Sequence, residues 1–248
     1  IMKVGICGIG KMGAAMAGRL VEVGHDAILW NRTRARADAL AGPGITVADS
    51  AASLARQADT VICMYLDEGA QDGVYGGETG LCAGLTAAHL VIDMSTVKPE
   101  GAGAAAERVG ATGADFIECP VGGTVAPAKT GKLLGMAGGT QQAFERAKPL
   151  LEQLCRRVEH VGPVGTGSAM KRAVNLPLAV YWEALGEALS IAVASGIDPD
   201  LAGDILGDSS GAASVAKPRI PIIVAAIRGE MPGAPAFDLS GMAKDLRL

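Results

Sequence analysis

The amino-acid sequence predicts an α/β protein in which a mostly parallel, doubly wound sheet is joined by a long helix to an all-α C-terminal domain. Short apolar runs alternate with helix-like patterns up to about residue 162, as is typical of a parallel sheet covered by helices on both faces. After Thr166 the strand-like runs stop. Between the two parts, the segment VGPVGTG supplies the glycine and proline that punctuate a boundary. We therefore expect a first domain at residues 1–162 and a second at residues 163–248.

The strands expected in the first domain are short apolar runs bounded by turn residues. They cover residues 3–7, 27–30, 45–47, 60–66, 89–94, 116–120, 132–137 and 158–161. The helices expected between them have apolar residues at helical spacing, and they cover residues 12–23, 33–41, 50–56, 97–109 and 141–155. Two of these helices carry start signals, because Ser50 is a capping residue and Pro99 lies in a first turn.

The second domain is expected to be helical. One long helix over residues 170–195 should bend at Pro177, because proline removes a helix hydrogen bond. Helical or loop segments follow at 201–206, 221–228 and 239–246. The most apolar stretch, 177–197, contains Glu183 and Glu187 near its middle, and two carboxylates there would be costly in lipid. We therefore expect a buried helix, for example at a subunit interface, rather than a membrane span.

Composition limits the classes of partner. With 248 residues, 49% of them hydrophobic, the chain can build a well-filled core. A net charge of −4 without a basic run argues against nucleic acid as a partner. Five dispersed cysteines and three histidines favour reduced thiols in a cytoplasmic protein and argue against a metal site. The first residues lead directly into a strand–turn pattern, so we expect a soluble protein without a signal peptide.

A glycine pattern, Gly-x-Gly-x-x-Gly, follows the first expected strand. The pattern alone is weak, because a plain strand-to-helix turn in a glycine-rich chain also produces it. Here it lies directly between a strand and a helix, where glycines permit a tight turn and N–H groups at the helix start bind a pyrophosphate. The sequence therefore predicts a dinucleotide site at Gly8, Gly10, Lys11, Met12 and Gly13.

The second expected strand ends in Asn31, Arg32 and Thr33 instead of the acidic residue that binds the ribose 2′-hydroxyl of NAD. An arginine can bind a 2′-phosphate through two hydrogen bonds, and a threonine can donate another. Arg34 and Arg36 extend this cluster at a helix start, where positive charge is unfavourable unless a ligand phosphate balances it. The alternative is that the arginines only cover an exposed helix start. We expect NADP (NADPH) to be preferred over NAD.

Residues that follow the other strands are further candidates. Met64, Tyr65 and Leu66 end a central strand, and ligands of parallel sheets bind at the carboxyl ends of strands, so we expect contacts with the cofactor. Asp93 either orients the loop that holds Ser95 or caps the following helix, and we favour the cap. His89 and His160 are expected in turns or at edges rather than in catalysis.

Lys171 and Asn175 lie four residues apart in a small, apolar segment, so on a helix they share one face. By themselves they also fit a lysine that reaches water beside a solvated amide. Four sequence blocks, the last of which contains both residues, resemble the β-hydroxyacid dehydrogenase family, in the branch of 3-hydroxyisobutyrate dehydrogenase-like proteins and glyoxylate/succinic semialdehyde reductases. The blocks are GICGIGKMGAAMAGRL, VIDMSTVKP, ECPVGGTVAPAKTGKL and GTGSAMKRAVN, and a fifth, MAKDL, lies near the end.

The resemblance implies a Rossmann-like domain joined by a long helix to an all-α domain that forms a homodimer or homotetramer. The family continues past the MAKDL block, so we expect the second domain to be incomplete at its C-terminus. The implied substrate is a small hydroxyacid or semialdehyde that carries a carboxylate.

The resemblance also implies roles for individual residues. Lys171 would be the catalytic acid/base and Asn175 would orient the substrate. The remaining implied positions are Ser95 and Thr96 near the nicotinamide ribose and substrate, the backbone of Gly122 and Gly123 on the substrate carboxylate, and Phe237 and Lys244 near the cofactor.

The chemistry of hydride transfer agrees with a lysine in this role. Reduction of a carbonyl leaves an alkoxide that needs a proton, and an ammonium group both donates it and stabilises the developing charge. Lysine titrates near a pKa of about 10.4, so it can act as an acid without a pKa shift, whereas a base would need a lowered pKa. We therefore expect reduction to be the physiological direction.

Three departures from the family pattern concern the substrate more than the reaction. The family commonly has a serine where this chain has Gly122, and Thr124 is a candidate to replace that donor. The family often has a second asparagine where Val174 stands, and Pro177 interrupts a helix that the family keeps regular.

Three alternatives remain at this point. Imine reductases share the fold but usually carry aspartate or tyrosine in place of Lys171. A catalytically silent NADP-binding scaffold would tolerate the departures at Gly122 and Val174. A 6-phosphogluconate-type decarboxylating dehydrogenase would need basic residues in the helical domain, and charges are sparse over residues 181–206.

Overall fold

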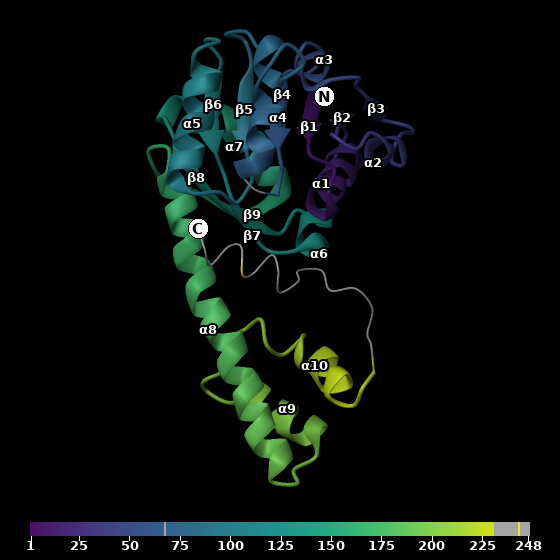
Figure 1. The fold of residues 1–248 in the computed structure, drawn as a ribbon, viewed down its shortest axis with the longest axis vertical. Helices are drawn as coiled ribbons and strands as arrows, with labels where there is room; N and C mark the ends of the chain where they lie inside the picture. The colour runs from purple at the N-terminus through teal and green to yellow at the C-terminus, as the bar shows by residue number, and fades with distance from the viewer. Residues whose placement is uncertain (67, 231–242, 244–248) are drawn as a thin grey trace. The chain divides into compact units, whose positions relative to one another are not determined.

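The computed structural model describes residues 1–66, 68–230 and 243. It forms two compact units, and the boundary between them in the sequence follows Arg172. The first unit contains a sheet with its covering helices, and the described part of the second contains helices only (Figure 1).

The first unit is built on a nine-stranded sheet. Its strands are β1 (Lys3–Cys7), β2 (Asp26–Trp30), β3 (Ile45–Val47), β4 (Thr60–Cys63), β5 (Leu90–Asp93), β6 (Asp115–Glu118), β7 (Val121–Gly122), β8 (Leu133–Gly139) and β9 (Cys155–Gly162). They lie in the order β3-β2-β1-β4-β5-β6-β8-β7, and β9 pairs with β8. The pairs from β3 to β6 are parallel, whereas β8 is antiparallel to β6 and β7. The predicted α/β class with a mostly parallel sheet is confirmed.

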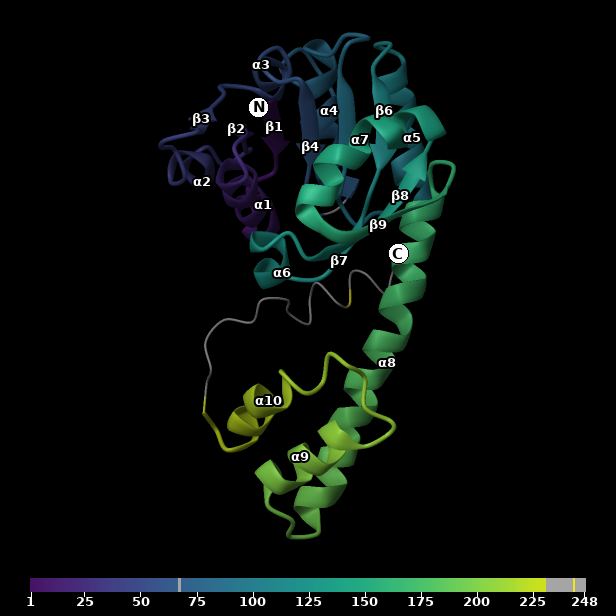
Figure 2. The same cartoon turned by 180° about the vertical axis from the view of Figure 1, so that it is seen from behind.

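Helices cover both faces of this sheet (Figures 1 and 2). They are α1 (Lys11–Glu22), α2 (Ala35–Asp38), α3 (Ala51–Ala55), α4 (Gln71–Tyr75), α5 (Pro99–Gly110), α6 (Val125–Lys129) and α7 (Gln141–Leu154), with short 3-10 turns η1 (Glu68–Ala70) and η2 (Leu81–Ala83). Side chains alternate between the faces of each strand. Ile62 and Ile92 therefore pack in one core with α1 and α7, and Val61 and Val91 pack in a second core with α3 and α5.

Most expected elements are present with shifted ends, and the differences have local causes. The strand expected at 60–66 ends at Cys63, because the Tyr65 N–H turns away from the sheet and donates to Ser95 Oγ (3.0 Å). The helix expected at 33–41 is the single turn α2. The capping role of Ser50 is confirmed, since its Oγ accepts from the Ser53 N–H (3.0 Å). The sequence pattern misses α4, α6 and β7, which are short and contain glycine or proline.

The second unit contains α9 (Pro199–Asp208) and α10 (Ile220–Ile227), and α8 (Thr166–Ala194) runs into it from the first unit. Its core is small and is formed by Leu185, Leu189, Ala202, Ala216, Ile220 and Val224. Pro177 lies inside α8, which continues through it. Among the described residues, α8 is the one helix whose length and apolar composition would suffice to cross a membrane, and only 11% of its most apolar window is buried within the chain. The helix that we expected to be buried therefore exposes apolar side chains in the single chain.

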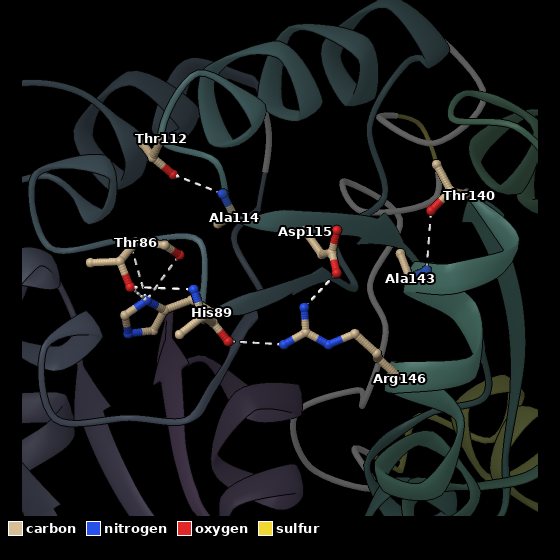
Figure 3. A network of polar contacts seen from close by, with 9 residues as sticks. Thr86, His89, Thr112, Ala114, Asp115, Thr140, Ala143 and Arg146 are labelled. Atoms are coloured by element: carbon tan, nitrogen blue, oxygen red, sulfur yellow. Dashed lines mark hydrogen bonds and ion pairs between the residues drawn. The ribbon is translucent and has the colours of Figure 1, made fainter.

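A polar network connects the segments at the amino ends of β5 and β6 (Figure 3). Arg146 forms an ion pair with Asp115 and donates to the carbonyl of Ala88 (2.9 Å). His89 Nδ1 accepts from the Thr86 N–H (2.9 Å), so His89 is a turn residue, as predicted. This network lies at the edge opposite to the predicted ligand site.

Candidate active site

The predicted site residues of the first unit follow strands that end at one edge of the sheet. Gly8 follows β1, Asn31 follows β2, Met64 follows β4 and Ser95 follows β5. These strands are parallel, so their carboxyl ends lie at the same edge. The chain leaves β1 toward β2 on one side and reaches β4 on the other, and such a switch point is where doubly wound sheets bind ligands.

The three glycines of the loop serve different purposes. Gly8 has φ +102°, and a Cβ there would lie 2.2 Å from the carbonyl oxygen of Met64. A Cβ on Gly13 would lie 2.1 Å from the carbonyl oxygen of Gly8. Among the described residues, no atom beyond the two chain neighbours of Gly10 lies within 4 Å of the position of a Cβ there. Two glycines are therefore required by the packing of the backbone, and Gly10 leaves an open approach to the start of α1.

The start of α1 suits an anion. Gly10 is its N-cap and provides no side-chain cap, and the first turn contains no acidic residue. Lys11 is exposed and Met12 is partly buried. N–H groups at a helix start and the helix dipole attract negative charge. A pyrophosphate at this loop, which the sequence predicts, remains a prediction that this geometry permits.

Asn31 connects β2 with the glycine loop. Its Oδ1 accepts from the Ile9 N–H (2.9 Å), and its Nδ2 donates to the carbonyl of Thr33 (2.9 Å). Arg32 and Thr33, the next two residues, are exposed. The amide of Asn31 therefore fixes the loop and the strand end without adding negative charge beside the position that the sequence predicts for the ribose.

The arginines of this region differ from one another. Arg34 forms ion pairs with Asp49 (2.6 Å) and Asp38 (3.3 Å), which raise the pKa of its guanidinium. Within the described part of the chain, neither Arg32 nor Arg36 takes part in an ion pair. The expectation that all three arginines need a ligand phosphate is wrong for Arg34, whose charge the two aspartates balance.

A buried carboxylate organises the loop after β5. Asp93 Oδ1 accepts from the Ser95 N–H (3.0 Å), and Oδ2 accepts from the hydroxyls of Tyr65 (2.6 Å) and Tyr75 (2.8 Å). Ser95 Oγ in turn accepts from the Tyr65 N–H (3.0 Å). Asp93 therefore orients the Ser95 loop. The capping role that we favoured is wrong, because the N-cap of α5 is Lys98, which is not an acceptor.

Electrostatics in this cluster follow from its burial. Burial raises the pKa of Asp93, and the hydroxyl and N–H donors partly offset that rise. Burial and the neighbouring carboxyl raise the pKa values of Tyr65 and Tyr75 as well, so both remain neutral donors. Sequence reasoning missed Tyr75 because it lies on α4, a one-turn helix with no local signal.

Three further predicted residues at this edge are more accessible. Leu66 is 71% exposed, and Thr96 is half-buried beside Ser95. Met64 is half-buried, with its carbonyl against Gly8. All of these residues belong to the first unit.

The loop predicted to bind a carboxylate begins in β7 and precedes α6. Gly123 has φ +124°, and a Cβ there would lie 2.9 Å from Leu133 Cδ2, so glycine is required. A Cβ on Gly122 would make only ordinary contact, 3.6 Å from Leu134 Cβ. Thr124 is the N-cap of α6, but its side chain makes no capping hydrogen bond. Its hydroxyl is therefore not committed to the helix.

Lys171 and Asn175 both lie on α8 with the spacing of one turn. Lys171 is 8% exposed and Asn175 is 5% exposed. The interpretation of a lysine that reaches water beside a solvated amide is therefore wrong. Phe237 and Lys244, which the resemblance places near the cofactor, lie outside the described residues.

Comparisons with known proteins cover the whole chain. Residues 3–162 match the NAD binding domain of 6-phosphogluconate dehydrogenase, and residues 165–248 match the NAD-binding domain of NADP-dependent 3-hydroxyisobutyrate dehydrogenase. A 3-hydroxyisobutyrate dehydrogenase of Pseudomonas aeruginosa is 32% identical, over 99% of this chain and 83% of the relative. Glyoxylate/succinic semialdehyde reductase 1 of Arabidopsis thaliana is 33% identical, over 100% of this chain and 84% of the relative.

Solved structures agree with these matches. Psf3 in complex with NADP⁺ and 2-OPP superposes with a TM-score of 0.89 at 29% identity, over 98% of this chain and 84% of that one. An imine reductase of Myxococcus stipitatus shares the fold, with a TM-score of 0.77 at 21% identity, over 96% of this chain and 81% of that one. The predicted resemblance is confirmed: the chain belongs to the β-hydroxyacid dehydrogenase family and is an NAD(P)-dependent oxidoreductase.

Proposed function

We propose that this protein is an NADPH-dependent oxidoreductase that transfers hydride between the nicotinamide and a small β-hydroxyacid or semialdehyde carrying a carboxylate, with Lys171 as general acid/base. The observation that carries this proposal is the burial of Lys171 together with Asn175 on one face of α8. Lysine is almost never buried without a reason. A proton donor beside a reacting carbonyl is such a reason.

The bound nicotinamide supplies the hydride. Lys171 holds a proton on Nζ, donates it to the oxygen of the reduced carbonyl and stabilises the charge that develops there. Asn175, one turn away on α8, orients the substrate by hydrogen bonding. Donation by an ammonium group serves reduction, whereas oxidation would need the neutral amine as a base, and we propose reduction as the physiological direction.

The preference for NADP rests on residues at the end of β2. Asn31 leaves the ribose position uncharged, and Arg32 is an exposed guanidinium beside it. Thr33 adds a hydroxyl. The 2′-phosphate of NADP gains charge-assisted hydrogen bonds from a guanidinium such as that of Arg32. NAD lacks this phosphate and therefore gains nothing from the guanidinium. The NADP⁺ bound to Psf3 and the description of the matching second domain also support this preference.

The substrate class rests on the loop from Gly122 to Thr124 and on the names of relatives. The backbone at Gly122 and Gly123 binds the carboxylate, and the uncommitted hydroxyl of Thr124 supplies the donor that a serine would otherwise provide. Relatives named for 3-hydroxyisobutyrate and for glyoxylate and succinic semialdehyde act on small compounds of this kind.

The first test is oxidation of NADPH, followed at 340 nm, against small carboxyl-bearing aldehydes and cyclic imines. Wild type is compared with Lys171→Ala and with Lys3→Ala, which removes an exposed lysine at the far edge of the sheet. We expect aldehyde turnover that falls by about 100-fold or more in Lys171→Ala only, because general acid catalysis contributes about that much. Fluorescence titration should show NADPH binding unchanged in both variants.

Two results would assign the protein differently. Imine turnover that survives in Lys171→Ala would indicate an imine reductase, whose fold this chain shares. Tight binding of NADPH without turnover of any substrate would indicate a cofactor-binding scaffold.

We also propose a cytoplasmic homodimer or homotetramer formed through the helical unit, without a membrane or nucleic acid as partner. Leu176, Val180 and Ile191 of α8 are each more than half exposed in the single chain. Exposed Glu183 and Glu187 lie on the same helix and would be costly in lipid. Light scattering on Val180→Glu and wild type tests the assembly: dissociation is expected, whereas a monomeric wild type that binds vesicles would contradict it.

A further inference from the structure

Glu118, the last residue of β6, is buried and receives four hydrogen bonds from the start of α8. Its Oε1 accepts from the N–H groups of Gly165 (2.5 Å) and Gly167 (2.9 Å). Its Oε2 accepts from the N–H (3.1 Å) and from the hydroxyl of Ser168. Glu118 is only 2% exposed. A side chain that lies 47 to 50 residues away in the sequence therefore caps this helix.

The cap leaves no N–H group of the first turn without a partner. Thr166 donates its N–H to the carbonyl of Pro163 (3.1 Å), and Ala169 donates to the carbonyl of Gly165 (3.0 Å). Glu118 accepts from the N–H groups between them. Unsatisfied donors and a partial positive charge occur together at a helix start, so a carboxylate there is favourable even when buried. Burial raises the pKa of Glu118, and the four donors partly offset that rise.

The chain is shaped closely around this carboxylate. A Cβ on Gly138 of β8 would lie 2.4 Å from Glu118 Oε1. A Cβ on Gly167 of α8 would lie 2.5 Å from the carbonyl oxygen of Met136 and 3.1 Å from Glu118 Cδ. Two glycines therefore let α8 approach β8 until only the carboxylate fits between them.

We propose that Glu118 is a positioning residue for Lys171: by fixing the first turn of α8 to the end of β6, it sets where the ammonium group of Lys171 lies. Ser168 is held by Glu118, and Lys171 is three residues further along the same helix, directly above it on one face. Both ends of this connection belong to the first unit. The inference rests on the proposed function of Lys171 as the proton donor.

The test compares Glu118→Gln with Thr140→Ala as a matched control. Thr140 caps α7 by accepting the Ala143 N–H (3.1 Å) and has no role at the site, so its loss should lower only the melting temperature. Two readouts are taken at equal fold content by circular dichroism. One is the rate at which formaldehyde and borane dimethylate Lys171, measured by peptide mass. The other is kcat with a carboxyl-bearing aldehyde, beside the Kd of NADPH.

In Glu118→Gln we expect dimethylation of Lys171 to accelerate about fivefold. Loss of a helix cap usually changes the equilibrium between the closed and the opened helix start by about that factor. We expect kcat to fall by roughly 10- to 100-fold, as a misplaced catalytic group causes, with the Kd of NADPH within about twofold of wild type. Thr140→Ala should change neither. Should Glu118→Gln fail to fold, Ser168→Ala removes one of the four hydrogen bonds and should give the same changes at smaller size.

Unchanged dimethylation of Lys171 in Glu118→Gln would overturn the inference, and so would faster dimethylation with an unchanged kcat. A wild type without turnover of any aldehyde would refute the proposed function instead. The labelling rates would then still decide whether Glu118 holds Lys171 in place.

Discussion

Asp93 and Glu118 are register partners on the adjacent parallel strands β5 and β6, and both carboxylates are buried. Each collects donors from a different segment: Asp93 holds the Ser95 loop and two tyrosines, and Glu118 holds the first turn of α8. Buried charge is tolerated only with several hydrogen bonds, so each carboxylate fixes the groups that donate to it. Two neighbouring strand ends thus position two parts of the proposed site.

Removal of the Asp93 carboxyl should change how stability depends on pH. Its pKa is raised by burial, so in the folded state it keeps its proton to a higher pH than in the unfolded chain. The stability that this difference contributes is fully present below the ordinary pKa of 3.8 and is lost as pH rises through the raised value. The advantage of wild type over Asp93→Asn in urea unfolding should therefore shrink as pH rises above 3.8 and then become constant. An advantage that grows with pH would contradict this.

The two kinds of loop glycine should respond differently to alanine. Gly13→Ala places a Cβ 2.1 Å from the Gly8 carbonyl, so it should destabilise the fold by more than about 2 kcal/mol. Gly10→Ala meets no atom of the described structure within 4 Å beyond its chain neighbours. It should leave the melting temperature nearly unchanged, while it weakens NADPH binding by about tenfold or more. Thermal unfolding and fluorescence titration of both variants check this. If Gly10→Ala bound NADPH as tightly as wild type does, binding of the cofactor's phosphates at this loop would be excluded.

Arg32 and Arg34 should differ in their effect on the cofactor. Arg34 is already paired with Asp38 and Asp49, whereas Arg32 is exposed at the proposed 2′-phosphate position. Arg32→Ala should raise the Kd of NADPH by about 10- to 100-fold, the loss expected for a charge-assisted contact, and leave that of NADH unchanged. Arg34→Ala serves as the control and should change neither. A similar loss for both cofactors in Arg32→Ala would exclude a 2′-phosphate contact.

The position of Gly122 should accept a serine. A Cβ there would make only ordinary contact with Leu134, and its φ is not positive. Gly122→Ser should therefore fold like wild type and, by adding a donor, lower the KM for carboxyl-bearing aldehydes several-fold, as one hydrogen bond to a charged group does. Gly123→Ser, with φ +124°, should destabilise the protein. An unchanged KM in well-folded Gly122→Ser would place the carboxylate elsewhere.

Thiol reactivity should follow burial. Burial raises the pKa of Cys63 and Cys119, and that of Cys155 to about 12, which leaves little thiolate at neutral pH. Cys82 is half-buried; burial raises the pKa of its thiol, and the charge of Arg108 partly offsets that rise. Iodoacetamide should therefore modify Cys82 first in the native protein, faster as pH rises, and the buried thiols only after unfolding. Early modification of Cys155 would contradict this.

Much of the fold is predictable from the sequence, because many of its elements are determined by residues that lie close together in the chain. The glycine loop, the strand β1 and the cap at Ser50 are all such features. The contacts of Asp93 with Tyr75 and of Glu118 with Ser168 cross 18 and 50 residues, so no local pattern contains them. The same holds for the pairing of Arg34 with Asp49, which lies in the loop after β3.

The candidate site divides in the same way. The sequence nominates Lys171 as a catalytic candidate by residue type and spacing. Its burial, which distinguishes it from a surface lysine, depends on packing and is known only from the structure. The tyrosines that hold Asp93 come from the strand end after β4 and from α4, and α4 is too short for a sequence period to reveal.

The hydrogen bond from the Ile9 N–H to Asn31 Oδ1 has a consequence for the evolution of cofactor choice. An aspartate at position 31 would present a carboxylate oxygen to the same N–H, so the glycine loop would keep its anchor. The new charge would repel a 2′-phosphate and accept a hydrogen bond from a ribose hydroxyl instead. On the proposed assignment, Asn31→Asp alone would therefore shift the preference from NADPH toward NADH; it keeps the acceptor for the Ile9 N–H and loses only the donor to the Thr33 carbonyl.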